Sequence, residues 1–169
     1  MEMFLQNGEE KKGINKIFLA AIAVGVLIIA GGIWLLTLQP TAQEQKQQEL
    51  AGAHLEGSPE FDGYTKNIIV TTDMNRTTES PLPIGTIVMQ IHGDIRNKGD
   101  RAINGLEVKV GVVDINNKVI KEKKVLIVPN QIASLQPNET IHVSVPMDGF
   151  NKKDDRANVR WKVTAIRFQ

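Results

Sequence analysis

Apolar and polar positions divide the chain into two parts with different periodicities. Residues 17–38, IFLAAIAVGVLIIAGGIWLLTL, form an apolar run that has no charged side chain and one hydroxyl, that of Thr37. A helix needs about 20 apolar residues to cross the hydrocarbon core of a bilayer. From residue 61 onward, apolar residues alternate with polar ones, which is typical of strands with one buried face. We therefore predict a tail over 1–16, a transmembrane helix over 17–38, a polar linker over 39–60 and one β-domain over 61–169.

The charges that flank the apolar run predict its orientation. Lys11, Lys12 and Lys16 precede the run, whereas the first basic residue after it is Lys46. The positive-inside rule then places the tail in the cytoplasm and the β-domain in the periplasm or outside the cell. A cleaved signal peptide is the alternative, but its apolar region normally has about 7–15 residues, and the best small-residue cleavage site, at 40–42, begins with proline. We favour an uncleaved, single-pass anchor in the inner or plasma membrane.

Small residues within the apolar run suggest one further role. Ala21 and Gly25 have the small-xxx-small spacing that lets two membrane helices approach closely, and Gly31 adds to the smooth surface. Glycine is also common in spanning helices that pack against nothing. Ordinary membrane composition is the interpretation that we favour, and helix packing stays open.

The alternating part of the chain predicts an all-β domain. Strands are expected over 66–72, 87–95, 106–112, 119–128, 141–145 and 159–165, with loops over 77–83, 129–138 and 147–155 and a tight turn over 115–118. Pro146 is expected to end its strand, and the two prolines of 77–83 argue against a strand there. Six short strands without an amphipathic helix among them predict an antiparallel, immunoglobulin-like β-sandwich.

Three stretches of the domain resemble one known family. GDIRNKG at 93–99, LEVKVGVVDINNKVI at 106–120 and LQPNET at 135–140 are similar to motifs of FxLYD-type domains, and the resemblance covers about 84–168. The chain departs from the pattern at Val112-Val113, where the family has its aromatic pair, and at Asn138, which replaces a glycine. The resemblance implies an immunoglobulin-like sandwich, often tethered in bacterial envelopes, with no shared enzymatic activity.

Composition removes several classes of chemistry. The chain has no cysteine, which excludes disulfides, thiolate zinc sites, iron–sulfur clusters and cysteine nucleophiles. A net charge of +1 gives no general case for nucleic acid. No G-x-S-x-G elbow occurs in the sequence. We therefore expect a protein that is not an enzyme and that carries no cofactor.

Two sets of polar residues are candidate binding sites. His92 and His142 fall on outward positions of two predicted strands, and they become neighbours if those strands pair. The aspartates in turns offer possible calcium ligands. For both sets we favour solvated side chains without a metal. His54 is expected to be a solvated linker residue.

The lysines of the 118–124 stretch suggest contact with anionic lipid, or, as we favour, protection of an edge strand against pairing with another sheet. These lysines are Lys118, Lys121, Lys123 and Lys124.

Six apolar residues interrupt the alternation of their strands. They are Ile69, Val113, Leu126, Val128, Ile166 and Phe168. We favour β-bulges or a second buried layer as the reason, and the alternative is a surface patch for another protein. The leading functional hypothesis is a membrane-tethered, non-catalytic interaction or assembly module, including an accessory subunit of a membrane complex. Its expected partners are the bilayer and other membrane or envelope proteins, and the alternative function is a small-ligand or metal-binding envelope module.

Overall fold

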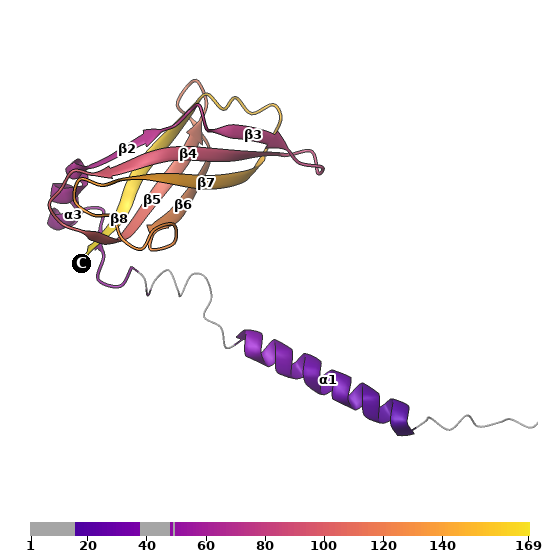
Figure 1. Cartoon of the computed structure of the whole chain (residues 1–169). Coiled ribbons are helices and arrows are strands. Elements are labelled where there is room, and N and C mark those ends of the chain that lie inside the picture. Colours follow the sequence, from indigo (N-terminus) through magenta and orange to yellow (C-terminus); the bar gives the residue numbers. More distant parts are fainter. Residues whose placement is uncertain (1–15, 38–47, 49) are drawn as a thin grey trace, which may run out of the picture. The chain divides into compact units, whose positions relative to one another are not determined.

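A computed structural model describes residues 16–37, 48 and 50–169 of the chain, which form two separate units (Figure 1). The predicted tail up to residue 15, Leu38, the 40–42 cleavage site and most of the linker lie outside the described residues. The first described unit is helix α1, Lys16–Thr37, whose stretch Ala20–Thr37 has a mean hydropathy of 2.3. Its 22 residues are about 33 Å long at 1.5 Å per residue, close to the thickness of a hydrocarbon core. The predicted apolar helix is therefore confirmed.

The second unit is the β-domain, which consists of two antiparallel sheets packed face to face (Figure 1). Sheet A has the strand order β1 (His54–Leu55), β8 (Asn158–Phe168), β5 (Ile103–Val113), β6 (Val119–Val128). Sheet B is built on β4 (Ile87–Asn97), which pairs on one side with β7 (Thr140–Phe150) and on the other with β2 (Ile68–Thr72) and β3 (Thr78–Pro81). The predicted sandwich is confirmed.

Aliphatic side chains between the two sheets form the core. The period-two positions of β4 and β5 are buried as the alternation predicts, among them Met89, Ile91, Ile95, Leu106, Val108, Val110 and Val112. Every residue of the core cluster lies between Phe61 and Phe168. The β-domain therefore has a complete hydrophobic core of its own, and residues 50–169 contain everything needed to fold without α1.

A short helical segment covers one end of the sandwich, where the sequence predicted only linker and strands. Helix α3, Pro59–Tyr64, starts at the N-cap Ser58, whose Oγ accepts a 3.4 Å hydrogen bond from Phe61 N, and it continues into the 3₁₀-turn η1, Thr65–Asn67. Phe61 and Tyr64 are buried. His54 is not a solvated linker residue, because it pairs with Ile166 in β1 and its ring lies 5.5 Å from that of Phe168.

The loops predicted over 77–83 and 147–155 are partly strand, because edge strands tolerate proline. Residues 78–81 form β3, whose only partner in the described chain is β4, so Pro81 needs no donor on its outer side. Strand β7 likewise does not end at Pro146 but continues to Phe150, and Met147 and Phe150 of the predicted loop are buried. Pro146 lies opposite Gln90, and the free edge of β7 accommodates its missing N–H.

The motif around Asn97 holds the turn between β4 and β5. The Asn97 side chain is fully buried; its Nδ2 donates to the carbonyls of Arg101 (2.8 Å) and Leu135 (3.4 Å), and its Oδ1 accepts from Gly99 N (2.9 Å). The Tyr64 hydroxyl lies 3.3 Å from the same Oδ1 and accepts a 2.8 Å bond from Arg101 N. One amide therefore joins α3, the turn after β4 and the loop before β7.

Three other motif positions have equally local reasons. A Cβ on Gly93 would lie 2.8 Å from the Thr71 carbonyl oxygen and 2.9 Å from Cζ2 of Trp161, and one on Gly99 would overlap the Tyr64 ring. Asn138 has φ +63°, the left-handed conformation that glycine adopts most easily. Asparagine tolerates this conformation, so the turn forms without a glycine at this position.

Candidate functional site

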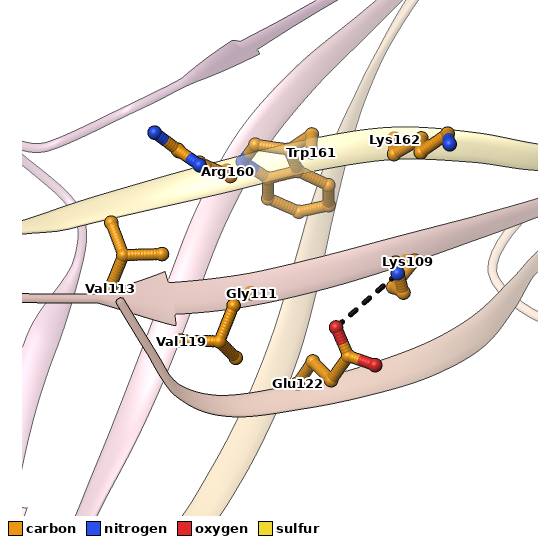
Figure 2. Close-up of a pocket in the computed structure, with 8 residues that line it drawn as sticks. All are labelled: Lys109, Gly111, Val113, Val119, Glu122, Arg160, Trp161 and Lys162. Carbon is orange, nitrogen blue, oxygen red and sulfur yellow. Dashed lines mark ion pairs between the residues drawn. The ribbon is translucent and has the colours of Figure 1, made fainter. Parts of the chain in front are cut away.

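The outer face of sheet A carries a groove of about 340 Å³, which we call the sheet A groove (Figure 2). Its lining residues come from β5, β6 and β8, and they are Lys109, Gly111, Val113, Val119, Glu122, Arg160, Trp161 and Lys162. A Cβ built on Gly111 would have its nearest neighbours, Glu122 Cβ and the Lys121 carbonyl oxygen, 3.9 Å away, so there is open space above this residue. The groove therefore exists because a central strand has no side chain at this position.

Strand register places the cations around the groove in one lateral row. Lys109 of the central strand β5 lies directly opposite Lys162 of β8 on one side and Lys124 of β6 on the other. The next outward position of β5, Gly111, lies opposite Arg160 and Glu122. Cross-strand neighbours share a face of the sheet at Cβ separations of about 5 Å. Four cationic side chains from three strands are thus gathered on this face.

Carboxylates partly balance these cations. Glu122 lies 3.3 Å from the Lys109 ammonium, Glu56 2.5 Å from that of Lys162, and the buried Glu107 3.9 Å from that of Lys124. The hydrogen bond from Lys162 lowers the pKa of the Glu56 carboxyl, and the charges of Lys162, Lys109 and Lys124 lower it further. Four cations against these three carboxylates leave a net charge of +1.

Arg160 accounts for that remaining charge. Among residues 16–37 and 50–169, no ion pair or side-chain hydrogen bond involves its guanidinium. Figure 2 shows it away from the Lys109–Glu122 ion pair. The Trp161 indole points to the other sheet, where its Nε1 donates to Thr72 Oγ1 at 3.0 Å. The groove therefore presents a partly apolar floor beneath a rim on which one cation is uncompensated.

The six apolar residues that interrupt the alternation do not form a common surface patch. Val113, Leu126, Val128 and Ile166 are buried, as expected for a second buried layer, and the β5–β6 and β5–β8 ladders shift register between residues 106 and 108. Phe168 packs edge-on against Tyr64, with their ring centres 4.6 Å apart, and under the Arg101 guanidinium. Of the six, only Ile69 is exposed, at 38%, so the alternative that they form a surface patch is wrong.

The histidines considered for metal binding lie on the outer face of sheet B, where a cation already interacts with the adjacent carboxylates. His142 lies opposite Asp94 and makes a short contact with its carboxylate, whereas His92 lies opposite Ser144. The Arg76 guanidinium lies 3.3 Å from Asp94 and 2.5 Å from Asp73, and its hydrogen bond lowers the pKa of the Asp73 carboxyl. In the described part of the chain, no three metal-binding side chains gather. The positive charge of Arg76 disfavours a metal ion here.

The lysines of β6 point to two different sides of the strand. Lys121 and Lys123 turn toward the neighbouring strand β7, where their ammonium groups donate to the carbonyls of Asp148 and Pro146, the second at 3.0 Å. Lys124 instead joins the row on the outer face of sheet A. The position of β6 at an edge of sheet A fits the interpretation that its lysines protect that edge.

The small residues of α1 remain candidates for helix packing. A Cβ on Gly25 or Gly31 would meet no heavy atom within 4 Å, and Ala21 is exposed. The spacing therefore keeps its two interpretations.

Sequence reasoning missed the sheet A groove because its cations are distant in the chain. Lys109, Lys124, Arg160 and Lys162 become neighbours only through the pairing of β5 with β6 and β8. The signal available in the sequence was the outward position of Lys109 on a predicted strand, which by itself indicates only a wet face.

Comparisons with known proteins give no family for the chain. No family model matches it, and no curated protein does. Similar solved structures include a DUF1425 family member from Shewanella sp. pv-4 (16% identity, 57% of this chain and 75% of that chain, TM-score 0.32) and a Northeast Structural Genomics Consortium target (13%, 62% and 85%, 0.38). A putative ApaA protein from Bordetella pertussis is similar over 48% of this chain and 68% of its own (20%, 0.31). Scores this low support no argument about function, and the FxLYD naming is not confirmed.

Proposed function

We propose that this chain is a membrane-tethered, non-catalytic module that presents a β-sandwich outside the cytoplasm to other envelope components. The observation that supports the proposal is α1. Its 22 residues carry no charged side chain after Lys16, and its large apolar side chains are exposed, Ile17 at 78% and Leu27 at 72%. Burial of an aliphatic side chain is worth about 1.5–3 kcal/mol, so this helix is strongly stabilised by a bilayer.

The tether limits where the β-domain works. Sixteen residues separate Thr37 from His54, and a chain of that length spans at most about 55 Å. With α1 in a bilayer, the β-domain therefore stays within reach of that membrane. This restriction suits a module that acts on lipids, envelope polymers or neighbouring membrane proteins.

The absence of cysteine makes the topology testable without background labelling. Single-cysteine variants Asn7→Cys in the tail and Lys152→Cys in the exposed loop after β7 are expressed in bacterial cells and treated with a membrane-impermeant maleimide. The proposal expects labelling of Lys152→Cys in intact cells with permeable outer membranes, and of Asn7→Cys only after lysis. It also expects the full-length mass and resistance to extraction with alkaline carbonate.

Two outcomes contradict the proposal. A mature protein that starts after α1 identifies the helix as a cleaved signal sequence. Equal labelling of both cysteines in intact cells contradicts the orientation. To test the interaction role, the β-domain is cross-linked in intact membranes; a strictly monomeric protein that captures no envelope component argues against a module for interaction or assembly.

A further inference from the structure

The lysine row on sheet A has no explanation in the stability of the fold. Like charges directly opposite each other on a sheet are destabilising, and Lys109 has such a neighbour on both sides. The ion pairs to Glu122 and Glu56 are solvent-exposed, and exposed pairs contribute little. On sheet B, by contrast, the Arg76 guanidinium lies between Asp73 and Asp94. The cations of sheet A are therefore better explained by an anionic ligand.

The residue types on this face suit phosphate. Lysine presents a compact charge with three rotatable donors, and several lysines around a groove can converge on one phosphate group. Arg160 adds donors in a fixed fork on the far side of the groove. Val119, which is 49% exposed, offers an apolar contact for the part of the ligand next to its phosphate.

The entry of the chain into the domain indicates which phosphate lies nearby. Strand β1, the first element after α1 in the β-domain, pairs with β8 at the edge of sheet A. Leu55 of β1 lies opposite Ala165 and is 58% exposed, and Glu56 follows it to the Lys162 ammonium. The tether thus reaches the domain beside the lysine row, and an exposed aliphatic side chain lies at the same edge.

We propose that the outer face of sheet A, through Lys109, Lys124, Arg160 and Lys162, binds the phosphate headgroups of anionic phospholipids. The biological setting rests on the proposed membrane tether, but the binding itself does not require α1. Headgroup binding by a soluble fragment and anchoring of the full chain are measured separately, so either can fail alone.

The test uses residues 50–169, which carry a complete core, and two kinds of vesicle. One is phosphatidylcholine alone, and the other is equal parts phosphatidylcholine and phosphatidylglycerol. The fragment should co-sediment only with the second kind, and less so at high salt, because the Debye length falls from about 10 Å at 0.1 M to 3 Å at 1 M.

Two variants of equal charge separate the face from general electrostatics. Each basic residue near an anionic surface contributes about 1 kcal/mol, so Lys109→Gln with Lys162→Gln should weaken partitioning about 25-fold. The control, Lys152→Gln with Lys153→Gln, changes the same net charge on the exposed loop after β7 and should have an effect below about threefold. Glu122→Gln, which releases Lys109, should strengthen partitioning about fivefold.

Four results overturn the proposal. The first is no preference for phosphatidylglycerol, and the second is an equal loss in both lysine pairs. The third is that soluble glycerol phosphate binds the fragment as tightly as the vesicles do, because the ligand is then a free phosphate compound. Binding to a polyglutamate peptide without binding to vesicles likewise replaces the lipid by an acidic protein segment.

Discussion

Replacing Asn97 by alanine tests whether one buried amide holds the end of the sandwich together. The change removes two hydrogen bonds from Nδ2, to the carbonyls of Arg101 and Leu135, and the acceptor of Gly99 N. The change also removes the acceptor of the Tyr64 hydroxyl. Four bonds at about 0.5–1.5 kcal/mol each give about 2–6 kcal/mol, and the stranded N–H adds about 1–3. We therefore expect the free energy of unfolding to fall by at least about 3 kcal/mol, a large part of the 5–15 typical of a domain.

The assay is urea unfolding of residues 50–169, followed by the fluorescence of Trp161. Asn158→Ala is the matched control, because Asn158 is exposed and its Oδ1 accepts only from the adjacent Val159 N, so the cost should stay within about 0.5 kcal/mol. Tyr64→Phe removes the hydroxyl next to the amide, and the double variant with Asn97→Ala should show a coupling of at least about 0.5 kcal/mol. A cost below about 1 kcal/mol for Asn97→Ala refutes the view that the amide organises this end.

Two further predictions concern one close contact and one ion pair of the sandwich. Gly93→Ala should cost about 1–3 kcal/mol in the same assay, because its Cβ overlaps a backbone carbonyl and the Trp161 ring. Gly111→Ala is the control, because its Cβ meets no close neighbour and the change should cost nothing; equal costs contradict the packing argument. The bidentate hydrogen bonds of Arg156 lower the pKa of the Glu79 carboxyl in the folded protein. The ion pair therefore stabilises the fold above the unfolded pKa near 4.5, and this contribution is lost as the pH falls through the lower, folded pKa. Because the Glu79 side chain is 41% exposed, Glu79→Gln should cost only about 0.5–1 kcal/mol at pH 7 and nothing at pH 2; a cost that does not change with pH is the contrary result.

The sequence predicts those parts of the fold that depend on a local period. The apolar helix and the inward positions of β4 and β5 follow from spacings of a few residues, and the structure confirms them. Helix α3 had a visible signal that was not used: Ser58 and Pro59 are a typical N-cap and first helical residue. Strand β7 could not be bounded in this way, because the tolerance of Pro146 depends on which of its edges is free.

The candidate site depends on register, which one sequence does not contain. Lys109 and Lys162 are far apart in the chain and become neighbours through a ladder that shifts at two points. A slip of one residue would turn Lys162 of β8 to the other face. The sequence therefore shows where charges are outward on each strand, whereas only the paired sheet shows that three lysines share a row.

A tether changes how strong the proposed lipid contact has to be. Four surface cations, three of them with carboxylate neighbours, bind a headgroup weakly in solution. Tethering raises the effective concentration of the domain at the membrane, so a contact that recruits only part of the free domain can orient the tethered one. Lys109→Gln with Lys162→Gln in the full chain should therefore leave the protein in the membrane but increase the exposure of sheet A, measured by maleimide labelling of Glu56→Cys. That combination of results would separate the role proposed for α1, location, from the role proposed for sheet A, orientation.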